Sequence, residues 1–250
     1  MGDFMKNRDK KFLYLFLALF LLVNMSLAAY QLSPLNVTYD ASGTGSAKVY
    51  TIVNDSDSPI AIEVKAVKRS IDIDGEEYND DASAYFLIQP NKMIIKPQST
   101  QLVRVQYRGP RIVTKETAYR IVSEQIPYSQ GAQAQSEGQT ISFLFVYSTS
   151  AYVRPTKVIE RVSASASINS DGKLEIILEN TGSVHQLLNN LAITITGSSG
   201  SEYKLSEEEV APLNGENLLV DSRRRLVIDI PSVLAADSTF KVAETHTFSY

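Results

Sequence analysis

In the segment IAIEVKAV (60–67), apolar residues occupy every second position. A period of two is typical of a β-strand with one buried face. The same alternation returns in four later runs, at 103–107, 174–179, 191–196 and 226–230. Turn-forming Gly, Pro, Asn and Asp residues separate these runs. The pattern predicts an all-β protein made of short strands in antiparallel sandwiches.

The chain has 250 residues, which suits two small domains of roughly 100–150 residues each. Pro155 lies between the second and third of the five alternating runs, and proline cannot continue a central strand ladder. We therefore expect two immunoglobulin-like β-sandwich domains, residues 29–153 and residues 156–250. The segment 206–210 is the best place for a short helix.

The first 28 residues predict a signal peptide. Four basic residues precede an unbroken apolar run of 12 residues, Phe12–Val23, and the small residues Ser26 and Ala28 follow. The alternative is an uncleaved anchor, but the run is shorter than the ~20 residues that a spanning helix needs. We expect export, cleavage before Ala29 and no stable membrane insertion afterwards.

Composition argues against several classes of function. Residues 1–28 carry four basic and two acidic residues, so their removal changes the net charge from −4 to −6, which disfavours nucleic-acid binding. The absence of cysteine excludes disulfides, thiolate metal sites and cysteine nucleophiles. His185 and His246 are the only histidines and fall in different predicted strands, so no metal site, catalytic triad or cofactor site is predicted. A secreted glycoside hydrolase ranks last, because nothing in the sequence pairs two carboxylates.

The segment ISFLFVYS (141–148) is apolar on both faces and follows a polar stretch, 128–140. Its position makes it the last strand of the first domain, and such a strand tends to lie at a sheet edge. An edge strand offers unpaired N–H and C=O groups and a row of alternate side chains to another protein, as in β-strand addition. The alternative is a strand buried on both faces within its own domain.

Short segments spread over about 220 residues resemble the periplasmic pilus-assembly chaperones of the PapD-like family, in particular their archaic or alternative branch. The matching segments are LSPL (32–35), VN (53–54), PIAIEV (59–64), IQP (88–90), IKP (95–97), QLVRV (101–105), ETAYRI (116–121), EQIP (124–127), YVRP (152–155), LLV (218–220) and SRRR (222–225). Each segment is weak alone, and their order and spacing carry the match.

The resemblance implies a boomerang of two sandwiches with a cleft between them, working in the periplasm without cofactors or catalysis. The last strand of the first domain would be the donor in donor-strand complementation, with Ile141, Phe143, Phe145 and Tyr147 entering the groove of a pilus subunit. The implied partners are pilus or fimbrial subunits and an outer-membrane usher.

The sequence departs from the family at the site that anchors the subunit's terminal carboxylate. The positions that match the family's arginine and lysine are Asn36 and Ser150, which carry no charge. Arg104 and Arg120 are candidate substitutes, because a guanidinium can bond both carboxylate oxygens. Arg104 could equally be a solvated surface residue. Arg154 resembles a family arginine that ties the two domains together.

Two further stretches have competing interpretations. The arginines of SRRR (222–225) are either a contact for an outer-membrane partner or exposed charge, and the acidic run 72–81 predicts a solvated hairpin rather than a calcium loop. The whole pattern also fits a structural or adhesive surface protein built of two immunoglobulin-like domains. In that case the 141–149 strand would pair within its own fold.

Overall fold

The computed structural model describes residues 30–128 and 144–250 of the chain. The first domain is a sandwich of two sheets. One sheet has the order β1-β3-β8-β6, with bounds β1 (Gln31–Ser33), β3 (Ala47–Asn54), β8 (Ser99–Tyr107) and β6 (Phe86–Gln89). The other has the order β2-β11-β9-β4-β5, with bounds β2 (Asn36–Asp40), β11 (Ser150–Arg154), β9 (Thr117–Ile126), β4 (Ile60–Ile71) and β5 (Glu77–Asp81). Two short strands extend this second sheet, β10 (Val146–Ser148) beside β9 and β7 (Lys92–Ile95) beside β4.

The alternation read from the sequence forms the core of this domain. Ile60, Ile62, Val64 and Ala66 are buried on the inner face of β4, as predicted. They share one apolar cluster with the inner residues of β8. Alternation produces this core because successive side chains of a strand point to opposite faces of its sheet. Two 3-10 turns, η1 (Thr44–Ser46) and η2 (Ser83–Tyr85), lie in the connections.

The second domain has its own core between two three-stranded sheets, of order β12-β13-β18 and β16-β15-β19. The bounds are β12 (Val162–Ile168), β13 (Leu174–Asn180), β18 (Arg223–Ile228), β16 (Glu202–Lys204), β15 (Asn189–Gly197) and β19 (Phe240–Thr247), with the pair β14 (Gln186–Leu187) and β17 (Asn217–Leu218) and a 3-10 turn η3 (Ser232–Leu234). The predicted helix is confirmed as α2 (Glu207–Val210), which Ser206 and Glu209 start with a reciprocal capping box.

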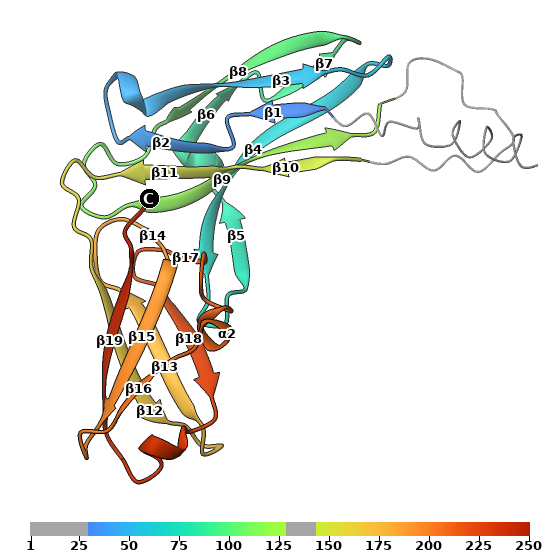
Figure 1. Ribbon diagram of the computed structural model, residues 1–250. Coiled ribbons are helices and arrows are strands. Elements are labelled where there is room, and N and C mark those ends of the chain that lie inside the picture. The colour runs from blue at the N-terminus through green and yellow to red at the C-terminus, as the bar shows by residue number, and fades with distance from the viewer. Residues whose placement is uncertain (1–29, 129–143) are drawn as a thin grey trace, which may run out of the picture.

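The two sandwiches are set at an angle to each other, as a boomerang (Figure 1). The expected fold class, two β-sandwich domains, is therefore confirmed. The hairpin of β4 and β5 leaves the first domain and runs along the second, and the end of the chain returns beside β11 (Figure 1). Tyr152 and Ala118 of the first domain form a small buried cluster with Leu219 of the second. No helix in the described ranges is long and apolar enough to cross a bilayer.

Candidate functional site

Strands β10 and β11 form one continuous line along β9. Val146 lies opposite Glu124 and Ala151 lies opposite Tyr119, so the register does not shift between the two strands. The interruption at Thr149 is only nominal, because its backbone amide still donates to the Ile121 carbonyl at 3.1 Å. The segment 146–154 is therefore a single strand at the end of the first domain.

Among the strands that the structure describes, none pairs with the outer edge of the first part of this strand. The parallel neighbour β2 begins to pair only at Ser150, opposite Asn36. The β10 segment before that point pairs with β9 alone among the strands that the structure describes. The β10 segment therefore extends beyond the end of β2, which is the second neighbour of β11.

Hydrogen-bond alternation shows which backbone groups face the open edge. The Gln125 amide donates to the Phe145 carbonyl at 2.9 Å, and the Thr149 amide donates to Ile121. In an antiparallel pair, residues that bond across the ladder alternate with residues that do not. The N–H and C=O groups of Val146 and Ser148 therefore point away from β9, toward the open side.

The two side-chain rows of this strand differ. Phe145 and Tyr147 are partly buried and pack against the core of their own domain. The Tyr147 ring lies edge-on to Tyr30 with centroids 4.7 Å apart. Leu144 and Val146 face the other way and are 48% and 57% exposed. Of the predicted donor residues, Ile141 and Phe143 lie outside the described residues.

Tyr30 closes the core beneath this strand. Its hydroxyl donates to the Ser123 carbonyl at 2.7 Å, and burial raises the pKa of the phenol to about 12. The phenol is therefore neutral at physiological pH. The edge of the core at Phe145 and Tyr147 is thus built of uncharged, mainly aromatic groups, which suits contact with another apolar surface.

One row across three strands lies on the outer face of the sheet, away from the core. Asn36 of β2 lies opposite Ser150 of β11, and the continuous register places Ser150 opposite Arg120 of β9. Neighbours in such a row have Cβ atoms about 4.5–5.5 Å apart. Arg120 Nη1 lies 3.4 Å from Ser150 Oγ. The structure therefore brings Arg120 beside Ser150 and into the same row as Asn36, one strand further away.

Arg120 is part of an ion cluster with Arg69 and Glu77. The Glu77 carboxylate accepts from Arg120 Nε at 2.6 Å through Oε1 and from Arg69 Nε at 2.7 Å through Oε2, and Oε2 also accepts from Arg120 Nη2. Burial opposes ionisation of Glu77, but the Arg120 hydrogen bonds and the Arg69 charge lower its pKa to about 2. Two guanidinium groups and one carboxylate leave the cluster with a net charge of about +1 near neutral pH.

A second charged cluster joins the two domains. Arg154 Nε donates to Glu116 Oε2 at 2.8 Å, and Glu116 Oε1 lies 2.6 Å from Nδ1 of His185 in the second domain. Burial opposes ionisation of Glu116, but the His185 and Arg154 hydrogen bonds hold the pKa of the carboxyl below its usual range. The His185 ring stacks on Tyr152 at 3.9 Å, and Arg154 lies over the Tyr250 ring at 4.5 Å. Arg154 thus lies between the domains.

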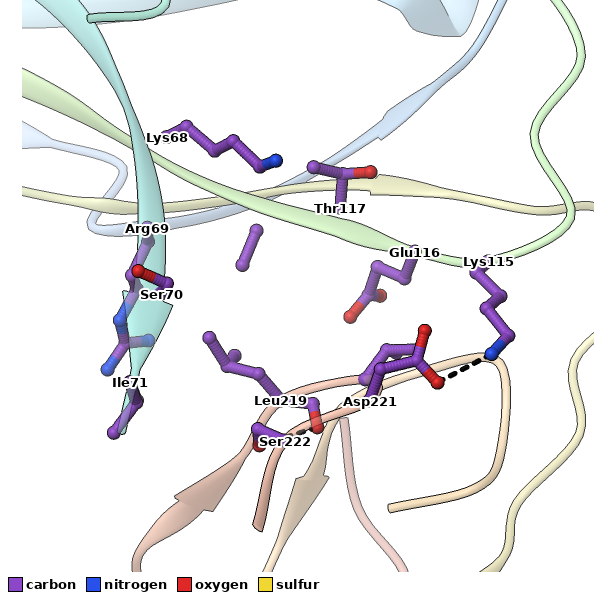
Figure 2. Close-up of a pocket in the computed structure, with 12 residues that line it drawn as sticks. Lys68, Arg69, Ser70, Ile71, Lys115, Glu116, Thr117, Leu219, Asp221 and Ser222 are labelled. Atoms are coloured by element: carbon purple, nitrogen blue, oxygen red, sulfur yellow. Dashed lines mark hydrogen bonds and ion pairs between the residues drawn. The ribbon is translucent and has the colours of Figure 1, made fainter. Parts of the chain in front are cut away.

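A cleft of about 380 Å³ lies between the domains, and Figure 2 shows residues that line it. Its walls are the end of β4 with Arg69, the start of β9 with Glu116, and the loop 219–222 of the second domain. The Lys115–Asp221 ion pair, at 2.5 Å, crosses it (Figure 2).

Other predicted residues lie elsewhere. Arg104 is exposed on β8, in the sheet that does not contain β10, and the structure does not bring it to the cleft. In the arginine run, Arg224 is buried and bonds Glu216 at 2.9 Å, so exposed charge is the wrong interpretation for that residue. Within residues 30–128 and 144–250, no group of three His, Cys, Asp or Glu is placed to hold a metal ion.

Three contributors to these clusters were missed in the sequence: Arg69, Glu77 and Glu116. Glu77 belongs to the acidic run 72–81, which was interpreted as a solvated hairpin, and its Arg120 partner is 43 residues away. Glu116 lies 38 residues before Arg154 in the sequence and contacts it only in the folded chain. No local pattern marks either pairing, because both depend on which strands become neighbours.

Comparison with known proteins agrees with this fold. Residues 29–158 match the family model described as "Pili and flagellar-assembly chaperone, PapD N-terminal domain". No curated protein matches the chain.

Solved structures share the two-domain fold at low sequence identity. The class 5 fimbriae chaperone CfaA aligns with a TM-score of 0.56 and 15% identity over 86% of this chain and 98% of its own. The CsuC–CsuE pre-assembly complex of archaic Csu pili from Acinetobacter baumannii aligns with a TM-score of 0.52 and 13% identity over 82% of this chain and 94% of its own. The Salmonella enterica complex of the SafA pilin with the SafB chaperone aligns with a TM-score of 0.51 and 13% identity over 89% of this chain and 98% of its own. With more than half of its length matched by that one family model, this chain belongs to the PapD-like pilus-assembly chaperones.

Proposed function

We propose that this protein is a periplasmic chaperone that lends the strand 141–149 to an incomplete pilus subunit. The open edge of β10 carries the proposal. The backbone groups of Val146 and Ser148 face that edge and are available to a strand of another protein. Strand addition of this kind needs an unpaired ladder and a row of apolar side chains, and this segment has both.

The predicted donor row fits a core shared by both proteins. Phe145 and Tyr147 already lie at the rim of the chaperone's own core, on the inner face of the sheet. A strand added at the open edge extends that sheet, so the subunit's core continues the same apolar layer. In the bound state Phe143 and Ile141 follow Phe145 on this face, because strand residues two apart share a face. Each large apolar side chain buried contributes about 1.5–3 kcal/mol.

Arg120 is the proposed anchor for the subunit's terminal carboxylate. It lies in the same cross-strand row as Asn36 and Ser150, one strand further from β2. Its guanidinium reaches Ser150 Oγ, and Ser150 is where β2 begins to cover the donor strand. An anchored carboxylate at this point would fix the register of the subunit along β10. Arg104, on the other sheet, is not part of this arrangement.

The remaining parts of the proposal follow from family membership and the N-terminal sequence. Residues 1–28 direct export and are removed, and the chaperone then works in the periplasm and delivers subunits to an outer-membrane usher. The protein binds and releases without catalysing a covalent reaction. The archaic branch of the family is the proposed subgroup.

Co-expression with a small pilin encoded near this protein's gene tests the proposal. Phe143→Asp should abolish recovery of soluble pilin, because a charge would enter the pilin's apolar groove. Leu144→Asp is the matched control: it adds the same charge one residue away, on the exposed row. It should retain most of the pilin yield, and both variants should keep the melting temperature of the free chaperone.

Three results would contradict the proposal. Equal pilin yield from wild type, Phe143→Asp and Phe145→Asp would show that the strand is not donated. Loss of yield from Leu144→Asp alone would place the opposite row in the groove. A monomer that ignores every pilin tested would favour the structural or adhesive surface protein.

A further inference from the structure

We propose that Glu77 is a resident carboxylate that competes with the subunit's terminal carboxylate for Arg120 and Arg69, and so weakens that anchor. The inference rests on the proposed function, because it concerns the same carboxylate anchor. It adds a residue on β5 whose role is to lower affinity rather than to provide it.

The geometry places Glu77 in the position that an anchored carboxylate would take. Both of its oxygens bond Arg120, one to Nε at 2.6 Å and the other to Nη2, and the second oxygen also bonds Arg69. This two-pronged arrangement is the strongest that a guanidinium offers a carboxylate. Nη1 of Arg120 does not bond Glu77, and its contact to Ser150 Oγ is long, at 3.4 Å.

Charge makes the competition unavoidable. The cluster keeps a net charge of about +1, so it still attracts one anion. An incoming carboxylate must either displace Glu77 from the fork of Arg120 or bind at Nη1 beside a like charge. Both routes cost free energy, so Glu77 lowers the affinity of the site whichever route is taken.

The surroundings of Glu77 allow its side chain to move away from Arg69 and Arg120. The side chain is 25% exposed, whereas those of Arg69 and Arg120 are 10% and 17% exposed. Glu77 begins β5, an edge strand whose other residues are exposed and which pairs with β4 alone in the described chain. Rotation of one side chain toward solvent therefore frees the two arginines without disturbing a core.

A weakened anchor suits a carrier that must release its cargo. The donor strand holds the subunit through many contacts, whereas the terminal carboxylate adds one charged contact that sets position. With Glu77 ready to rebind Arg120, the carboxylate can leave without exposing an unpaired buried guanidinium, which would be costly.

Binding of a small carboxylate to the full mature chain tests the inference without a pilin. The probe is N-acetylglycine, followed by NMR through the Nε resonances of Arg69 and Arg120, with N-acetylglycinamide as the uncharged counterpart. Glu77→Gln should tighten N-acetylglycine binding by about tenfold, the effect of removing one like charge at close range. The amide should bind neither protein.

Glu124→Gln is the control for net charge, because it removes the same charge from the same sheet where Glu124 pairs with Lys65. It should leave the affinity unchanged, and Arg120→Gln added to Glu77→Gln should abolish the gain. Unchanged or weaker binding by a folded Glu77→Gln protein would overturn the inference, as would equal binding of acid and amide. Either result leaves the donor strand intact if Phe143→Asp still abolishes pilin recovery, so the two proposals fail separately.

Discussion

At the scale of single residues, the cluster of Arg69, Glu77 and Arg120 shows how a buried charge is stabilised. Arg120 and Arg69 are mostly buried, and an isolated guanidinium there would be expensive. Glu77 offsets that cost by bonding both. The sequence identified Arg120 as a candidate anchor, but it could not identify the Glu77 partner, which reaches the site only because β4 and β5 form a hairpin.

The pH dependence of stability follows from Glu77. Its folded pKa of about 2 lies below the ordinary value of 4.5, so the ionised form stabilises the fold. That contribution is complete above pH 4.5 and is lost as the pH falls from about 4.5 toward 2. Urea unfolding at several pH values should show wild type losing more stability than Glu77→Gln over this window.

A parallel loss of stability in both proteins between about pH 4.5 and pH 2 would contradict this role. Glu124→Gln is the comparison variant, since its exposed pair with Lys65 is expected to contribute little. It should follow the wild-type curve.

At the scale of elements, strand alternation was predictable and strand neighbours were not. The inner rows of β4, β8, β13 and β15 are buried as their apolar periodicity indicated. Periodicity is a local property, so one strand suffices to reveal it. Which strand lies beside β10, and where β2 stops, depends on pairing between distant segments. The open edge therefore required the structure.

Core and surface positions of the first domain should respond differently to truncation. Ile62 on β4 is fully buried, whereas Val49 on β3 is 53% exposed. Ile62→Ala should lower the free energy of unfolding by about 2–5 kcal/mol, because it leaves a cavity in a packed core. Val49→Ala should change it by less than about 0.5 kcal/mol. Equal effects in chemical denaturation would show that the inner face is misassigned.

At the scale of the whole molecule, several contacts fix the second domain against the first. Asp74 at the tip of the β4–β5 hairpin pairs with Arg225 of β18, and a side chain at Gly75 would collide with the Arg224 guanidinium. The buried Glu116 joins Arg154 to His185. The sequence predicted two units with a boundary near Pro155. These contacts show which residues join the two units.

Removal of the Glu116 charge should destabilise the contact between the two domains. Glu116→Gln leaves Arg154 without its carboxylate, and removing one partner of a buried pair typically costs about 3–5 kcal/mol. We expect a lower melting temperature and a larger radius of gyration in small-angle X-ray scattering. Arg225→Ala, which removes a more exposed pair, should cost less than about 1 kcal/mol. A reversed order would contradict the interface described above.

Amide hydrogen exchange of β10, measured by NMR with and without a bound pilin, tests the lending of this strand most directly. The amides of Val146 and Ser148 face the open edge, while the Thr149 amide bonds Ile121 and serves as the internal reference. In the free protein the amides of Val146 and Ser148 should exchange fast, and pilin binding should slow their exchange by about a hundredfold or more. A stable pilin complex in which both amides exchange as fast as in the free chaperone would contradict strand donation.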